Sequence, residues 1–265
     1  MNFLDKYLFS ESRTIHLNHS WLLTSHSLCL FRMGCFVYSL GIYSMSNILM
    51  GTFYKGYQYL TYWGEVLTMI AFLFLTIDSI EYIQKRKDKK LTRVSKIAIL
   101  FNEVAFSFEL TIVLLFWVSV YPSDEEKGNS SVYYPSNLHT HMACLVLMWI
   151  ENFLNYIEFV PNHLFVLIFV GLCYVVDNVI VTLFINFDPV YKVLTWTDGM
   201  SYGVVVGAFI IFVLHFLFSI LVFRKFKSKK EIIYMENEIA SQNKDESHNG
   251  IFNVEMEKQN GIENK

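Results

Sequence analysis

Two side chains in the sequence, Thr61 and His141, are of the types that form a nucleophile and its general base. Each stands just inside a hydrophobic run, Thr61 within residues 59–63 and His141 within residues 137–141. A hydroxyl that passes its proton to a neighbouring imidazole becomes able to attack a carbonyl carbon. The pairing requires that the two elements carrying these residues begin at the same end of the fold.

The composition predicts a membrane protein and excludes several classes of site. The chain is 54% hydrophobic and 17% aromatic with only 17% charged residues, which is unlike an ordinary soluble domain. It shows no metal-ligand spacing, no glycine-rich phosphate loop and no basic-aromatic stripe, so we expect no cofactor, no metal ion and no nucleic-acid partner. All four cysteines lie in apolar runs and are expected to be packing residues.

Six apolar stretches are long enough to cross about 30 Å of hydrocarbon, which takes roughly 20 residues. The predicted fold is therefore all-α, a polytopic bundle of six transmembrane helices with a polar interior. The predicted spans are residues 27–48, 61–83, 97–121, 140–158, 163–186 and 203–223. A segment 1–26 precedes this transmembrane domain, 27–223, and a basic, then acidic, disordered tail follows it over 224–265.

The positions of lysine and arginine predict the orientation of the bundle. Basic residues concentrate in the loop 85–93 and in the stretch 224–230 after the last span. Both then face the cytoplasm, as do both termini, while loops 49–60, 122–139 and 187–202 lie on the other side. The glycosylation acceptor Asn129-Ser130-Ser131 falls in one of these outer loops, and tyrosines and tryptophans gather at that face. The plasma membrane and the endoplasmic reticulum remain equally open.

This topology places Thr61 and His141 at the same end of the bundle, because the second and fourth spans both start there. Other strongly polar side chains lie within the spans, where lipid would not tolerate them, and each needs a partner or a function. The candidates to support the pair or line an interior cavity are Glu65, Glu109, Asn137, His139, Glu151, Asn152 and Asp177.

Structural roles compete with these functional ones. A threonine at the start of a helix is most often a cap for the backbone, and a histidine there can rest in the membrane interface. Glu109, Glu151 and Asp177 can equally be acids that join helices, and Arg32 is expected to be a counter-ion for Asp78 or to reach the headgroups. Glu151 lies about 15 Å along the helix from His141, too far for direct contact.

Several short motifs, in order, resemble the androgen-induced membrane hydrolase family over about residues 25–225. They are Gly56-Tyr57-Gln58-Tyr59-Leu60-Thr61, Phe116-Trp117-Val118-Ser119-Val120-Tyr121-Pro122, Asn137-Leu138-His139-Thr140-His141, Ile150-Glu151 and Val190-Tyr191-Lys192-Val193-Leu194. The resemblance implies an intramembrane threonine hydrolase of fatty acid esters of hydroxy fatty acids. It places the nucleophile on Thr61 and the histidine on His141, with His139 two residues away as the other possible base.

Other residues are similar to the related rolling stone proteins, namely Trp63-Gly64, Trp196 and Asp198. Three functions therefore remain open. The first is a lipid ester hydrolase, for which a membrane lipid is the substrate. The second is a non-catalytic membrane protein of the rolling stone type that acts in adhesion, fusion or assembly. The third is a small channel or proton-linked carrier that uses Glu109, Glu151 and Asp177 as a relay. The oligomeric state is not predicted.

Overall fold

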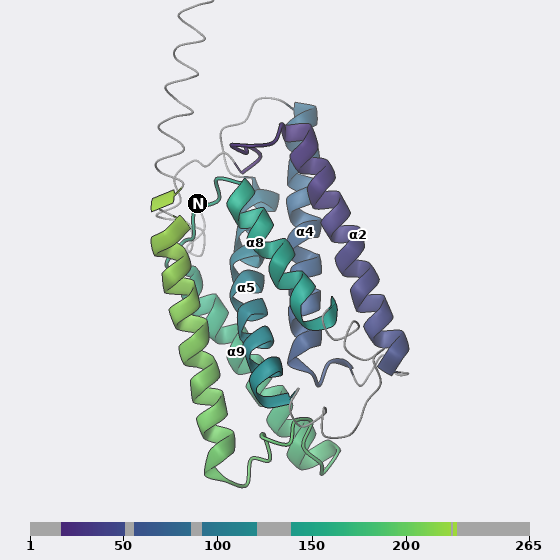
Figure 1. The fold of residues 1–265 in the computed structure, drawn as a ribbon, viewed down its shortest axis with the longest axis vertical. Helices are drawn as coiled ribbons and strands as arrows, with labels where there is room; N and C mark the ends of the chain where they lie inside the picture. The colour runs from purple at the N-terminus through teal and green to yellow at the C-terminus, as the bar shows by residue number, and fades with distance from the viewer. Residues whose placement is uncertain (1–16, 51–55, 86–91, 121–138, 224, 227–265) are drawn as a thin grey trace, which may run out of the picture. The chain divides into compact units, whose positions relative to one another are not determined.

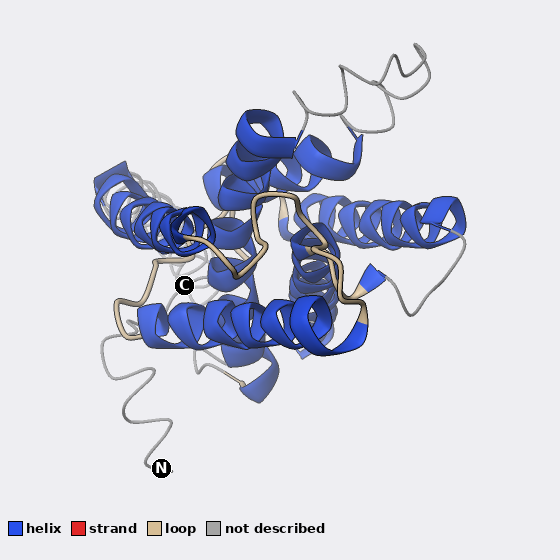
Figure 2. Cartoon of the chain, turned by 90° about the horizontal axis from the view of Figure 1, so that it is seen from below, coloured by secondary structure: helices blue, strands red, loops and turns tan. Residues whose placement is uncertain are grey.

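The computed structural model describes residues 17–50, 56–85, 92–120, 139–223, 225 and 226. These residues form helices and connecting loops with no strand among them (Figure 2). The chain divides into Met1–Arg224 and Lys225–Lys265, and the features below belong to the first of these units.

The first unit is built from long helices that run in alternate directions (Figure 1). The elements are α2 (Ser25–Met50), α4 (Leu60–Lys85), α5 (Arg93–Leu115) continued by the π-helical turn η1 (Phe116–Val120), η2 (His139–Ala143) leading into α8 (Cys144–Leu154), α9 (His163–Ile180) continued by η3 (Val181–Ile185), and a last helix Gly199–Phe223. As a result of the alternating directions, the first residues of α4 and of the segment that leads into α8 lie at one end of the bundle, the lower end in Figure 1.

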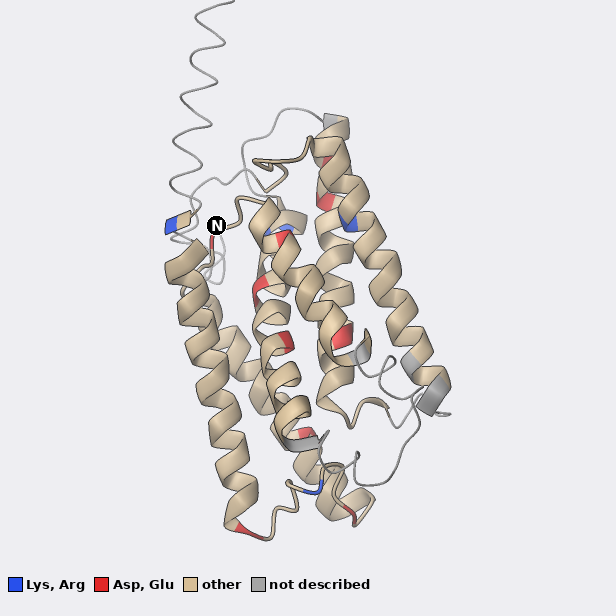
Figure 3. Ribbon diagram, viewed as in Figure 1, with Lys and Arg blue, Asp and Glu red and all other residues tan. Residues whose placement is uncertain are grey.

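Within the described residues, five helices are long and apolar enough to cross a membrane. They span Ser25–Met45, Leu60–Gln84, Arg93–Val118, His163–Ile185 and Gly199–Phe223. Their outward faces carry large exposed apolar side chains, and charged residues are few along them (Figure 3). Such faces suit contact with lipid rather than water, as expected for a multi-pass membrane protein. Examples are Leu30, Val37, Phe165, Phe169, Val206, Ile210 and Leu214.

The fourth predicted span, residues 140–158, forms a shorter helix than expected. η2 and α8 contain 5 and 11 residues, together about 24 Å of helix, which is less than the usual hydrocarbon thickness. α8 ends at Asn155, whose backbone is extended and whose Oδ1 accepts a hydrogen bond from the N–H of Ile157 at 2.8 Å. Residues 155–160 therefore leave the helix although they are apolar enough to continue it.

Polar side chains mark the ends of two other helices. Thr92 and Ser95 cap α5 reciprocally, each side chain bonding the other residue's backbone N–H. Asp198 precedes the last helix and accepts from the N–H of Ser201 at 3.1 Å. This backbone hydrogen bond lowers the pKa of Asp198 below its ordinary value.

α5 lies at the centre of the bundle, with buried residues all around it. Its aromatic side chains join the core through ring contacts: Phe106 lies 4.9 Å from Trp149 of α8, and Phe108 lies 4.6 Å from Phe212 of the last helix, measured between ring centroids. The three elements are thereby fixed relative to α4, which also packs against α5. The four cysteines are free thiols, three of them buried.

Candidate active site

Thr61 and His141 meet in the structure. Thr61 is the second residue of α4, and its Oγ1 lies 3.2 Å from Nδ1 of His141, within hydrogen-bonding distance. Thr61 is buried and His141 is partly buried. Thr61 is the second residue of α4 and its hydroxyl lies within hydrogen-bonding distance of the imidazole, which favours a role for this hydroxyl other than capping the helix.

The imidazole of His141 belongs to one π-helical turn, η2, and packs against a residue of another, η1. His141 belongs to η2, and its ring stacks on that of Phe116, the first residue of η1, with centroids 3.5 Å apart and planes 16° apart. π-Helical turns are rare and occur often at functional sites, because the wider turn redirects the side chains that follow. Here the stacking fixes the plane of the ring, so that Nδ1 points at Thr61.

His139, the other candidate base, points elsewhere. Its Nδ1 lies 2.8 Å from the hydroxyl of Tyr38 on α2, and the residue is exposed. Of the two histidines, it is therefore His141 that the fold places against Thr61. Asn137, predicted as a supporting residue, lies outside the described residues.

A third polar group reaches the start of α4 from the loop that follows η3. The hydroxyl of Tyr191 accepts a hydrogen bond from the backbone N–H of Leu60 at 3.1 Å. Burial raises the pKa of this phenol to about 12, and hydrogen bonding by the nearby side chains of Tyr174 and Thr61 opposes the rise. The contact with Leu60 has no local sign in the sequence beyond the motif Val190-Tyr191-Lys192-Val193-Leu194.

The loop that carries Tyr191 is held in place at both ends. Asn186 donates to Gln58 Oε1 at 3.0 Å, and the indole N–H of Trp196 donates to Asn178 Oδ1 at 2.9 Å. Trp196 adopts a φ of 62°, an unfavourable conformation for a bulky side chain. Such strain costs about 1–3 kcal/mol and persists only where the surroundings impose it, typically near functional sites.

Two predicted acids are buried between α4 and α5. Glu65 lies one turn after Thr61 on the same buried face, and Glu109 accepts a hydrogen bond from Thr68 Oγ1 at 2.8 Å. The helices approach closely here: a Cβ on Gly64 would lie 2.9 Å from Glu109 Oε1. Glu65 therefore lies on the α4 face that continues inward from Thr61, and Glu109 contacts α4 from α5. Asp177, on α9, is only partly buried.

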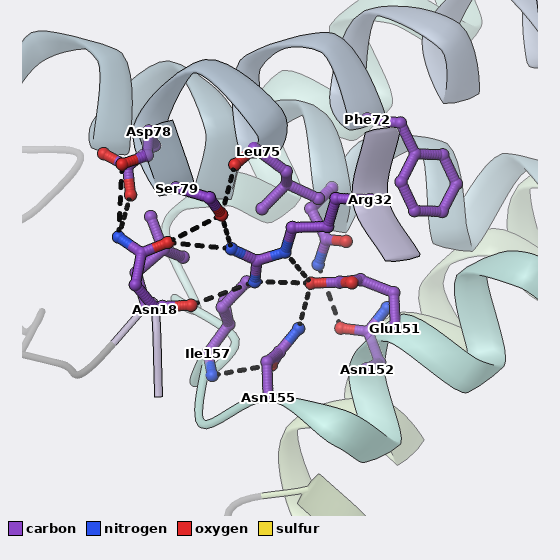
Figure 4. A network of polar contacts seen from close by, with 12 residues as sticks. Asn18, Arg32, Phe72, Leu75, Asp78, Ser79, Glu151, Asn152, Asn155 and Ile157 are labelled. Atoms are coloured by element: carbon purple, nitrogen blue, oxygen red, sulfur yellow. Dashed lines mark hydrogen bonds and ion pairs between the residues drawn. The ribbon is translucent and has the colours of Figure 1, made fainter. Parts of the chain in front are cut away.

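Glu151 and Asn152 belong to a different polar cluster (Figure 4). Glu151 Oε1 accepts from Nη2 of Arg32 at 2.6 Å, and both side chains are fully buried. The prediction that Arg32 pairs with Asp78 is wrong, since Asp78 accepts from Asn18 at 2.6 Å and from Ser95 instead. Asn152 accepts from Asn102 of α5 at 2.9 Å.

This cluster also binds the chain that precedes α2. Arg32 donates to the backbone oxygen of Leu17 and to Asn18 Oδ1, both at 2.9 Å. An isolated bridge joins Ser20 to Asn155. The buried ion pair thus joins α2 and α8 to the segment 1–26, for which the sequence predicted no such contact.

Comparisons of the chain with protein-family models, with curated proteins and with solved structures found no match. A hydroxyl hydrogen-bonded to an imidazole, at the first turn of an apolar helix, is an arrangement suited to attack on a carbonyl carbon.

Proposed function

We propose that this protein is an intramembrane hydrolase of lipid esters, with Thr61 as nucleophile and His141 as general base. The observation that carries the proposal is the 3.2 Å contact between Thr61 Oγ1 and His141 Nδ1. The fatty acid esters of hydroxy fatty acids that the motif resemblance implies are the substrate class to test first.

The reaction proceeds in two halves. As Thr61 Oγ1 bonds to the ester carbonyl carbon, its proton passes to His141 Nδ1 and the carbonyl π pair moves onto oxygen. When the carbonyl reforms, the alcohol leaves with the proton from Nδ1, and an acyl-threonine remains. Water then attacks the acyl group by the same route, with His141 again accepting and returning the proton. General base assistance of this kind is typically worth about 10²–10⁴ in rate.

The position of the pair supports a lipid substrate. Thr61 is the second residue of an apolar helix long enough to cross a membrane, and aromatic side chains surround the start of that helix. Tyr59 packs edge to face on Tyr191, and Trp63 on Tyr174, with ring centroids 5.9 and 5.7 Å apart. Aromatic residues of this kind favour the boundary between headgroups and acyl chains, where lipid esters lie.

The proton-relay alternative receives less support from the structure. It requires Glu151 to exchange protons, whereas the Glu151 carboxylate is ion-paired with Arg32 and also accepts from Asn155 at 2.8 Å. Glu151 is therefore suited to joining helices.

The test is hydrolysis of a fatty acid ester of a hydroxy fatty acid by the purified full-length protein in liposomes, followed by mass spectrometry of the released acid. We expect Thr61→Ala and His141→Ala each to lower the rate at least about 100-fold. The matched controls are Thr76→Ala, a buried α4 threonine whose hydroxyl bonds Phe72 of its own helix, and His26→Ala, an exposed histidine at the start of α2. Hydrolysis that is equally fast in all five proteins would refute the proposal.

A further inference from the structure

The hydroxyl of Tyr191 lies next to the residue that precedes the nucleophile, although the reaction described above assigns it no role. It accepts from the N–H of Leu60, the residue before Thr61, at 3.1 Å, and the Thr61 side chain is near enough to influence its pKa. The first N–H groups of a helix have no carbonyl in their own helix to bond. The phenol oxygen therefore satisfies one of these donors and is fixed beside the first turn of α4.

The hydrogen bonds around the Tyr191 oxygen leave its O–H available as a donor. Because the Leu60 N–H can only donate, it occupies an acceptor position on the Tyr191 oxygen and leaves the O–H free to be donated. Tyr174, the other neighbour, donates to the backbone oxygen of Gln58 at 3.3 Å and accepts from Asn178 at 3.5 Å. The Tyr191 O–H can then be donated toward Thr61 Oγ1, and the Thr61 O–H can be donated to His141 Nδ1.

We propose that Tyr191 is a third catalytic residue, whose O–H donates a hydrogen bond to the oxyanion formed when Thr61 adds to the ester. This inference rests on the proposed hydrolase function. When the Oγ1–carbon bond forms, the Thr61 proton moves to His141 and negative charge appears on the former carbonyl oxygen. That oxygen is attached to the carbon bonded to Oγ1, so a donor already beside Oγ1 is close to it.

The surroundings of Tyr191 suit it to this role. Burial raises the pKa of Tyr191 to about 12, so the phenol keeps its proton at neutral pH. The strained, doubly anchored loop fixes the hydroxyl before substrate arrives, and a donor already in place stabilises a developing charge most effectively.

The first test compares Tyr191→Phe with wild type in ester hydrolysis by the full-length protein. Loss of one oxyanion donor costs about 10²–10³ in kcat, and we expect a loss of that order with KM changed less than about threefold. Tyr202→Phe is the matched control, because it removes a hydroxyl from an exposed tyrosine whose ring packs on Trp196. A kcat for Tyr191→Phe within twofold of wild type would overturn the inference.

A second test keeps both the ring and the hydroxyl, and so decides the question even if Tyr191→Phe folds poorly. A fluorinated tyrosine of lower phenol pKa is incorporated at position 191, and kcat is measured against pH. A proton-donating role predicts a new fall in kcat on the alkaline side as the fluorinated phenol ionises, whereas an unchanged profile would contradict it. Were wild type inactive, or Thr61→Ala fully active, the hydrolase proposal itself would fail.

Discussion

At the scale of single residues, the identity of the general base depends on which histidine faces Thr61. His141 and His139 are two positions apart, and in a regular helix they would point about 200° apart around the axis. The structure separates their roles accordingly: His141 Nδ1 contacts Thr61, and His139 Nδ1 contacts Tyr38. The sequence placed both at the right end of the bundle but could not choose between them, because the choice depends on the π-helical turn η2 and its stacking on Phe116.

This difference gives a direct prediction. His139→Ala should keep at least half of the wild-type hydrolysis rate, since it removes only a contact with the exposed hydroxyl of Tyr38, whereas His141→Ala should lose nearly all of it. The two variants are compared in one liposome assay with protein amounts matched. If instead His139→Ala were the inactive variant, the assignment of the base would be wrong.

At the scale of elements, close contact between α4 and α5 positions the first turn that carries Thr61. Gly64 makes this contact possible, because a Cβ there would lie 2.2 Å from Ile112 Cδ1 and 2.9 Å from Glu109 Oε1. Thr61, Glu65 and Thr68 stand at i, i+4 and i+7, a spacing that places them on one face of a helix, and all three are buried. The closeness of the contact was not predictable, because it depends on which residue of α5 lies opposite Gly64.

Gly64→Ala should therefore destabilise the protein. Overpacking of this kind typically costs about 1–3 kcal/mol, and the melting temperature in detergent should fall. Gly41→Ala on α2 is the control, since a Cβ there meets nothing within 4 Å and alanine favours the helix. Equal melting temperatures for Gly64→Ala and wild type would show that α4 and α5 are not this close.

The ion pair between α2 and α8 gives a second prediction at this scale. Removing one partner leaves a buried charge without compensation, which typically costs about 3–5 kcal/mol. Arg32→Leu and Glu151→Leu should each lower the melting temperature sharply, and the double variant should be more stable than either. A double variant whose loss equals the sum of the single losses would argue against a direct pair. The sequence did not reveal this partnership, because the residues are 119 positions apart and only the packing order of the helices brings them together.

At the scale of the whole molecule, the sequence predicted six membrane spans. Within the described residues, five of these correspond to helices long and apolar enough to cross a membrane, and the fourth span is shorter. The length of the fourth helix was overestimated. The residues after Asn155 are mostly apolar, and this composition is compatible with either a continued helix or an extended chain. The loop contact made by Tyr191 was equally hidden, because it depends on the left-handed backbone at Trp196 and on distant anchors.

The orientation of the bundle remains a prediction that one modification can test. If the loop between the third and fourth predicted spans faces the lumen, Asn129 in Asn129-Ser130-Ser131 should carry an N-linked glycan in a eukaryotic host. Glycosidase treatment should then increase the mobility of the wild-type band and leave Asn129→Gln unaffected. A cysteine introduced in the tail and labelled only after permeabilisation would support cytoplasmic termini. Labelling of that cysteine in intact cells would contradict the predicted topology.

The proposed activation of Thr61 by His141 can be tested directly without knowing the natural substrate. Full-length protein in membranes is treated with a fluorophosphonate, which forms a bond from phosphorus to an activated hydroxyl oxygen with loss of fluoride, and the modified residue is located by peptide mass spectrometry. The account predicts an adduct on Thr61 in wild type and none on this residue in His141→Ala. A correctly inserted wild-type protein without an adduct on Thr61, or an adduct of equal yield in His141→Ala, would contradict it.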